Sequence, residues 1–152
     1  MNDPLSLIYE ARVVKKSDPF QAIYDRIKIV NGQKIIECSV NLSNQELTKL
    51  PDLHDVHVNG CFYCDNNRLT SLEGSPMSVS GEFYCNINQL TSLKGAPKSI
   101  GQYFHCGDNP LPEGTPEVMN AQQYQECRKE LKKKEDLQKE FGNDIGQTIY
   151  DL

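Results

Sequence analysis

Hydrophobic and polar positions recur at a fixed spacing through the middle of this chain. The segment that begins at Phe62, FYCDNNRLTSLEGSP, returns at Phe83 as FYCNINQLTSLKGAP and starts a third time at Phe104 as FHCGDNPL. Four positions of this segment recur 21 residues apart: Phe62, Phe83 and Phe104; Cys64, Cys85 and Cys106; Asn67, Asn88 and Asn109; and Leu69, Leu90 and Leu111. A period of this length is typical of a solenoid, in which each repeat forms one coil and packs on its neighbours.

Apolar residues alternate at the start of each repeat, which predicts a short strand. Phe62 and Cys64 then point inward, while the residue between them points to solvent. The amide of Asn67 follows a turn and faces the interior, where it can satisfy backbone groups of adjacent coils. Leu69 and Leu72 fill the core from the opposite side. The Gly-Ser-Pro and Gly-Ala-Pro runs that follow reverse the chain.

A degenerate first coil precedes these repeats. Its apolar residues Val40, Leu42, Leu47 and Leu50 lie 22 positions before their counterparts, and Gln45 stands in the asparagine position. The sequence therefore predicts an α+β solenoid of about four coils over residues 39–112, with a short parallel β-sheet. Because terminal coils expose apolar surface and strand edges, both ends of the solenoid are expected to carry caps.

Residues 1–38 have the signals of an N-terminal cap. Asp3-Pro4 and Asp18-Pro19 each read as a helix start, the second leading into Phe20, Ile23, Tyr24 and Ile27 at helical spacing. Asn31-Gly32 lies between two apolar runs and predicts a β-hairpin. We expect helix, helix and hairpin to close the core at the Val40 coil. An alternative is that Leu5 to Tyr9 is a loose peptide that folds on a partner.

Residues 113–152 are expected to form the C-terminal cap and a tail. Thr115-Pro116-Glu117 reads as a helix start. The residues that share one face of the helix, and that we expect to cover the Phe104 coil, are Val118, Ala121, Tyr124, Cys127, Arg128 and Leu131. Gly142-Asn143 predicts the end of the helix. The tail from Asp144 to Leu152 either packs back or engages a partner.

Composition narrows the class of protein. The chain has 152 residues and a formal net charge of -5, which argues for one domain and against nucleic acid as a partner. No apolar run approaches the length of a membrane span, and no secretory signal is visible at the start. We therefore expect a cytoplasmic protein without a membrane partner.

Six cysteines raise the question of disulfide or metal chemistry. Three of them occupy one repeat position and read as small buried hydrophobes, so we expect reduced, structural thiols. Cys61 and Cys64 form a Cys-x-x-Cys pair, but a strand places them on opposite faces, as it does His105 and Cys106. With no second such pair and no catalytic motif, we expect no metal, no cofactor and no enzymatic activity.

The outward strand positions are the candidate binding site. Tyr63, Tyr84 and His105 stand between the inward Phe and Cys of successive coils, so stacking sets them in a row. Acidic and amide groups flank this row, a composition that suits a protein-binding surface. An alternative is cross-strand stacking that only stabilises the sheet. The candidate partner-binding residues are Tyr63, Tyr84, His105, Tyr103, Glu82 and Asp65.

The run F-Y-C-x-x-N-x-L-T-S-L-x-G-x-P resembles the short leucine-rich repeats of bacterial and tailed-phage proteins. This resemblance covers about residues 38–112. It implies a non-enzymatic recognition scaffold in the cytoplasm. We expect the chain to be a monomer or weak oligomer. For a small phage-like solenoid with its own caps, the resemblance further implies a phage-encoded inhibitor or modulator of a host protein, such as a defence component, acting in the host cytoplasm.

Two other functions stay open from the sequence. The first is a structural or assembly protein that self-associates through its terminal helix or a sheet edge. The least favoured function is an enzyme or zinc protein built on Cys61, Cys64 and His105.

Overall fold

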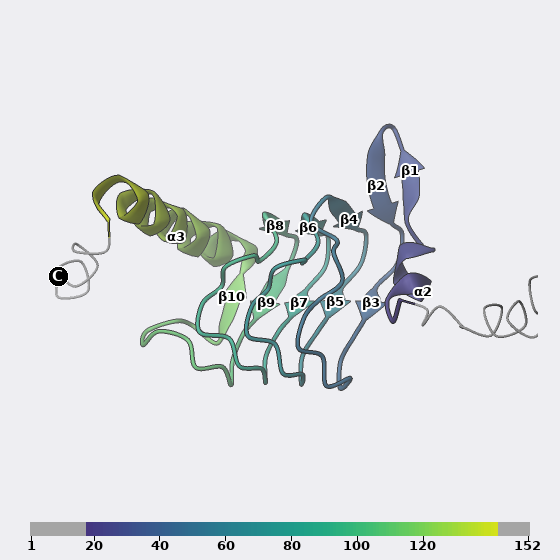
Figure 1. The fold of residues 1–152 in the computed structure, drawn as a ribbon. Coiled ribbons are helices and arrows are strands. Elements are labelled where there is room, and N and C mark those ends of the chain that lie inside the picture. The colour runs from purple at the N-terminus through teal and green to yellow at the C-terminus, as the bar shows by residue number, and fades with distance from the viewer. Residues whose placement is uncertain (1–17, 143–152) are drawn as a thin grey trace, which may run out of the picture.

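The protein is a β-solenoid with a helix at its C-terminal end, as shown by a computed structural model that describes residues 18–142 (Figure 1). The repeats make about three turns and carry two five-stranded sheets on different sides of the coil. The expected helix after Asp3-Pro4 and the expected tail after Gly142 lie outside the described residues.

The first sheet contains the strands predicted from the repeat. Its order is β10-β9-β7-β5-β3, with the strands of the coils parallel and β10 antiparallel to β9. Phe62 lies opposite Phe83, and Phe83 lies opposite Phe104, so the 21-residue period becomes the register of the sheet. The strands are β3 (Val40–Asn41), β5 (Phe62–Tyr63), β7 (Phe83–Tyr84), β9 (Tyr103–His105) and β10 (Val118–Asn120).

A second sheet corrects the prediction of one parallel sheet. Val58, Val79 and Ile100 also recur at 21-residue spacing, lie in register and are buried. β6 and β8 each contain a single buried residue, so only β4, with Val56 and Val58, shows an apolar alternation. The sheet has the order β1-β2-β4-β6-β8, and its strands are β1 (Lys28–Val30), β2 (Gln33–Ile36), β4 (Val56–Val58), β6 (Ser78–Val79) and β8 (Ser99–Ile100).

The core lies inside the coil and consists of stacked identical residues. The rings of Phe62 and Phe83 are 5.3 Å apart, and those of Phe83 and Phe104 are 5.2 Å apart, nearly parallel in both pairs. All three are fully buried, as are Leu69 and Leu90 on the opposite side. The sequence prediction of inward Phe, Cys and Leu is therefore confirmed.

Three asparagines, Asn67, Asn88 and Asn109, form an asparagine column that joins the coils. The Asn88 amide donates to the carbonyls of Cys64 and Cys85, both at 3.0 Å, while its Oδ1 accepts from the Leu69 amide at 3.0 Å. Asn67 and Asn109 repeat this pattern. Each side chain thus satisfies backbone groups of two coils, as the sequence predicts.

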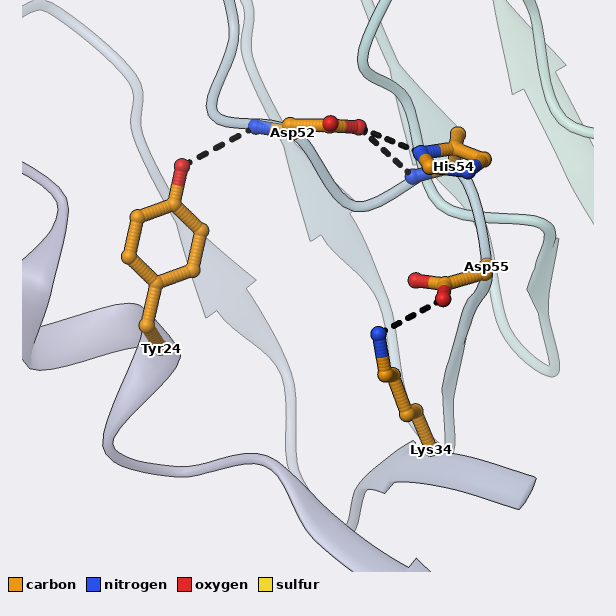
Figure 2. Close-up of polar contacts among 5 residues, drawn as sticks. All are labelled: Tyr24, Lys34, Asp52, His54 and Asp55. Carbon is orange, nitrogen blue, oxygen red and sulfur yellow. Dashed lines mark hydrogen bonds and ion pairs between the residues drawn. The ribbon is translucent and has the colours of Figure 1, made fainter. Parts of the chain in front are cut away.

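A short helix and a hairpin close the N-terminal end. Helix α2 (Gln21–Tyr24) is shorter than its helical spacing suggested, and the hairpin β1–β2 turns through Asn31-Gly32, both with positive φ. Figure 2 shows how both elements contact the first coil. The Tyr24 hydroxyl accepts from the Asp52 amide at 3.1 Å, and Lys34 pairs with Asp55 at 2.6 Å.

The C-terminal end departs from the prediction of a helix that starts at Thr115. Residues Val118 to Asn120 form strand β10, and helix α3 (Ala121–Phe141) begins only after them. Asn120 caps the helix together with Gln123, whose side chain accepts from the Asn120 amide. Gly142 ends the helix, as predicted. Because β10 returns antiparallel to β9, the Phe104 coil does not complete a further turn.

Candidate protein-binding face

The first sheet turns one side to solvent, and we call this side the outer face. Its central column follows from the strand register, because each outward residue lies beside its equivalent in the next coil. The column runs through Asn41, Tyr63, Tyr84, His105 and Val118. The predicted row of outward aromatic side chains is therefore present.

Tyr63, Tyr84 and His105 form this aromatic row. The rings of Tyr63 and Tyr84 are 4.9 Å apart with planes 13° from parallel. Those of Tyr84 and His105 are 4.2 Å apart and 2° from parallel. All three side chains are half-buried, so their planes cover one another while their edges face solvent. Such ordered rings lose little conformational freedom when a partner binds.

One carboxylate oxygen holds two members of the row in place. The Tyr84 hydroxyl donates to Glu82 Oε2 at 2.5 Å, and His105 Nε2 lies 2.8 Å from the same oxygen. These bonds lower the pKa of Glu82, the bond from Tyr84 contributing most. The bond to Glu82 raises the pKa of Tyr84 to about 12. The row is thus fixed both by stacking and by hydrogen bonds.

The flanks of the row contain the other predicted residues. Tyr103 is 49% exposed and lies at 6.3 Å from the His105 ring, tilted against it. Asp65 lies on the other flank, where its Oδ1 accepts from the Ser43 hydroxyl at 2.6 Å. A side-chain hydrogen bond with Cys61 raises the pKa of Tyr63. All six predicted residues therefore lie on one face.

Two residues of the central column were missed by the sequence prediction. Val118 is 47% exposed beside His105, but it had been placed on the buried side of a helix. Asn41 lies beside Tyr63 in the degenerate first coil. The 22-residue offset of that coil was the signal that could have placed Asn41. Val118 lies beyond the repeats, so no repeat spacing could have placed it.

The thiols inside the coil are structural groups. Cys64 Sγ donates to the Tyr84 carbonyl at 3.1 Å, and Cys85 Sγ donates to the His105 carbonyl at 3.3 Å. Burial raises the pKa of both thiols well above the ordinary value, and it raises the pKa of Cys106 to about 11. A protonated, buried thiol is a poor nucleophile and a poor metal ligand.

Cys61 and Cys64 do not converge on one site. Cys64 is buried in the coil, whereas Cys61 is partly exposed on the outer face. Among residues 18–142, no group of three or more His, Cys, Asp or Glu side chains has the geometry of a metal site. Within the same range, no helix combines the length and apolar character needed to cross a bilayer.

The fold and the outer face together define the class of this protein as a β-solenoid with an exposed aromatic row. No known protein family, no curated protein and no solved structure matches the chain.

Proposed function

We propose that this chain is a non-enzymatic protein-binding module of the short leucine-rich-repeat type, and that its outer face contacts the partner. The observation that carries this proposal is the aromatic row, which is rigidly ordered and yet half-exposed. Tyrosine in such a setting offers a large contact area together with hydroxyl groups, and it is enriched among the residues that dominate interface energies.

The repeat pattern supports the finer features of the proposal. The degenerate Val40 coil and the truncated Phe104 coil, added to the two regular repeats, amount to four coils of the leucine-rich type. The resemblance to phage repeats favours a host protein as the partner, with the chain inhibiting or modulating it in the host cytoplasm. The size of the outer face suits a peptide, a loop or one small domain.

Stacking that only stabilises the sheet is the competing explanation for the row. The interior Phe stack already holds the same strands together, and solvent-facing strand positions need no aromatic ring for that purpose. The hydrogen bonds that Glu82 accepts also orient the rings of Tyr84 and His105. We therefore favour a binding role that uses a stable platform.

The test compares affinity capture by three forms of the tagged protein from extract of the organism that encodes it, or of its host. Tyr84→Ala should retain less than about a tenth of the wild-type capture of a specific protein, since truncation of a central interface aromatic costs 2 kcal/mol or more. The matched control is His57→Ala, an outward, half-buried ring on the second sheet. Its capture should equal that of the wild type. Equal capture by both variants, with native circular dichroism, would contradict the proposal.

Self-association through α3 is a second candidate function. Figure 1 shows the C-terminal half of α3 extending beyond the last coil, and Phe141 is 53% exposed. A helix that carries apolar side chains beyond the body offers a surface for a second copy. Sedimentation velocity at micromolar concentration tests this function. A monomer favours the binding module, whereas a stable dimer that Phe141→Ser dissolves favours assembly.

A further inference from the structure

The aromatic row has one open end. Tyr84 is covered on both sides, by Tyr63 and by His105. Tyr63 is covered by Tyr84 on one side only, and the next position of the column is Asn41, a smaller side chain. Within the part of the chain that the structure describes, no other ring stacks on Tyr63.

Asn41 carries no ring that could stack on Tyr63. Its Oδ1 accepts from the Ser43 amide at 3.0 Å, so this oxygen is engaged within its own segment of chain. Asn41 is exposed. One face of the Tyr63 ring, on the side of Asn41, is therefore not covered by another ring. We call this end of the row the step, and a planar group of another molecule can continue the stack there.

The charge around this step is negative. Asp65 and Glu82 lie on the two flanks of the row, and of the two carboxylate oxygens of Asp65 only Oδ1 accepts a bond from a described residue. No Lys or Arg lies in the central column of the outer face or in the two columns that flank it. The central column is Asn41, Tyr63, Tyr84, His105 and Val118; one flanking column is Ser39, Cys61, Glu82, Tyr103 and Asn120, and the other is Ser43, Asp65, Asn86 and Gly107.

Arg26 approaches the end of one flanking column but is already engaged. Its Nη2 donates to the Ser39 carbonyl at 2.6 Å and lies 2.7 Å from Cys38 Sγ. Glu82 is engaged by Tyr84 and His105, whereas Asp65 Oδ2 has no bond to a described residue and can accept from a cation of another molecule.

We infer that the open end of the row is an arginine-binding site. This inference rests on the proposed function and names the chemistry of the partner: a basic segment whose guanidinium stacks on the free face of Tyr63, above Asn41, and donates to Asp65. A guanidinium is planar, always charged and able to hydrogen-bond in its plane while it stacks. A lysine ammonium offers the charge without the plane, and a neutral aromatic ring offers the plane without the charge.

The probes are three short peptides that differ at one residue: acetyl-Gly-Gly-Arg-Gly-Gly-amide and its lysine and citrulline counterparts. Each is titrated into the isotope-labelled protein and followed by NMR. The arginine peptide should give saturable shifts at the amides of Asn41, Tyr63 and Asp65, and its δ-methylene protons should move upfield in the ring current of Tyr63. The lysine peptide should bind several-fold more weakly, and the citrulline peptide should produce no saturable shift.

Two variants probe the site from opposite directions. Asn41→Tyr fills the step with another ring and should abolish arginine binding; the contact it removes is the exposed bond from the Ser43 amide. Asp65→Asn keeps the shape and should weaken binding several-fold. The matched control is His57→Ala, a half-buried ring on the second sheet, which should leave the titration unchanged. Equal binding of the citrulline peptide, or undiminished binding by Asn41→Tyr, overturns the inference.

The two proposals fail in different ways. If Tyr84→Ala loses the captured protein but the arginine peptide does not bind at Tyr63, only the arginine site is wrong. If the peptide binds as described but Tyr84→Ala captures the partner normally, the arginine site stands and the aromatic row is not the protein-binding surface.

Discussion

The phenol ring of Tyr124 lies 4.6 Å from the ring of Phe104, with the two planes 24° apart. A helix thereby supplies the ring that the next coil would otherwise contribute to the interior stack. Tyr124 is fully buried, and its hydroxyl donates to the Pro97 carbonyl at 2.5 Å. Because the stack would otherwise end in water, this contact closes the apolar end of the solenoid.

Truncation of this ring should strongly destabilise the fold. We expect Tyr124→Ala to lower the free energy of unfolding by about 3–5 kcal/mol, as for other buried aromatic residues. The control Tyr103→Ala removes a ring that is 49% exposed and should cost under about 1 kcal/mol. Urea denaturation followed by circular dichroism measures both. Similar losses in the two variants would show that α3 does not cap the core.

The asparagine column gives a second prediction. Asn88→Ala removes the interior bonds of this amide. The Cys64 and Cys85 carbonyls keep their bonds from Asn67 and Asn109, but the Leu69 amide loses its acceptor, and a buried group left without a partner costs about 1–3 kcal/mol. We expect a loss in this range. Gln45 occupies the same repeat position in the first coil but is exposed, so Gln45→Ala should change stability by less than about 0.5 kcal/mol. A loss below about 1 kcal/mol for Asn88→Ala would contradict this role.

Ile87 is held in a backbone conformation that suits it poorly. Its φ is 55°, whereas the equivalent positions carry Asn66 and Asp108, which tolerate the left-handed region. We expect Ile87→Asn to raise the free energy of unfolding by about 1 kcal/mol. The reverse change, Asn66→Ile, should lower it, both through strain and through loss of the bond to Asn44. Chemical denaturation of the pair tests the argument, and a destabilised Ile87→Asn protein would refute it.

Alanine substitutions at Gly95 and Gly114 distinguish the stability cost of steric crowding from that of backbone strain. Both have positive φ, 84° and 86°, so alanine is strained at either position. A Cβ at Gly95 would lie 2.4 Å from the Glu73 amide nitrogen, whereas one at Gly114 would meet nothing within 4 Å. We expect Gly114→Ala to cost about 1 kcal/mol and Gly95→Ala about 2–4 kcal/mol. Thermal unfolding compares the two variants. Equal losses of stability would mean that the coil at Gly95 moves away from Glu73 without cost, so that crowding contributes nothing.

The Glu82 bonds make the outer face respond to pH. Folding lowers the pKa of Glu82, so its contribution to stability is complete above the ordinary value of 4.5 and is lost as the pH falls through the folded value. Folding raises the pKa of Tyr84 from 10.0 to about 12, so its contribution is complete below pH 10 and is lost between pH 10 and about 12.

Tyrosine ring-carbon NMR titration measures the second effect directly. The Tyr84 midpoint should be near pH 12 in the wild type and should move toward 10 in Glu82→Gln, because the charge that opposes ionisation is removed. Glu73→Gln, an exposed carboxylate elsewhere on the coil, serves as the control and should leave the midpoint unchanged. A midpoint near 10 in the wild type would show that the Tyr84–Glu82 bond is absent in solution.

Much of the solenoid was predictable because the same residue types recur at a fixed spacing in the sequence. A residue that recurs every 21 positions must meet its own kind in the next coil, so Phe83, Cys85 and Asn88 could be placed inside before any coordinates. The alternation of Phe83, Tyr84 and Cys85 then placed the tyrosine outside. The hairpin at Asn31-Gly32 was readable for a different reason, since a two-residue turn needs positive φ at both positions.

Local sequence signals were misleading where a distant strand decided the outcome. Thr115-Pro116-Glu117 has the composition of a helix start, but Val118 to Asn120 lie against the open edge of β9 and pair with it. Unpaired backbone groups at a sheet edge outweigh a weak local preference for helix. The second sheet was missed because β6 and β8 each contain a single buried residue and so show no alternation, although Val58, Val79 and Ile100 recur every 21 residues.

The sequence by itself thus determined which residues stack, since the repeat length equals one turn of the coil. Only the tertiary structure decided what those stacks meet at their ends: the Tyr124 ring at one end of the core, and the open step above Asn41 at one end of the aromatic row. A repeat specifies contacts between equivalent residues. Its ends have no equivalent neighbour, so their contacts depend on where the flanking helix and strands come to lie.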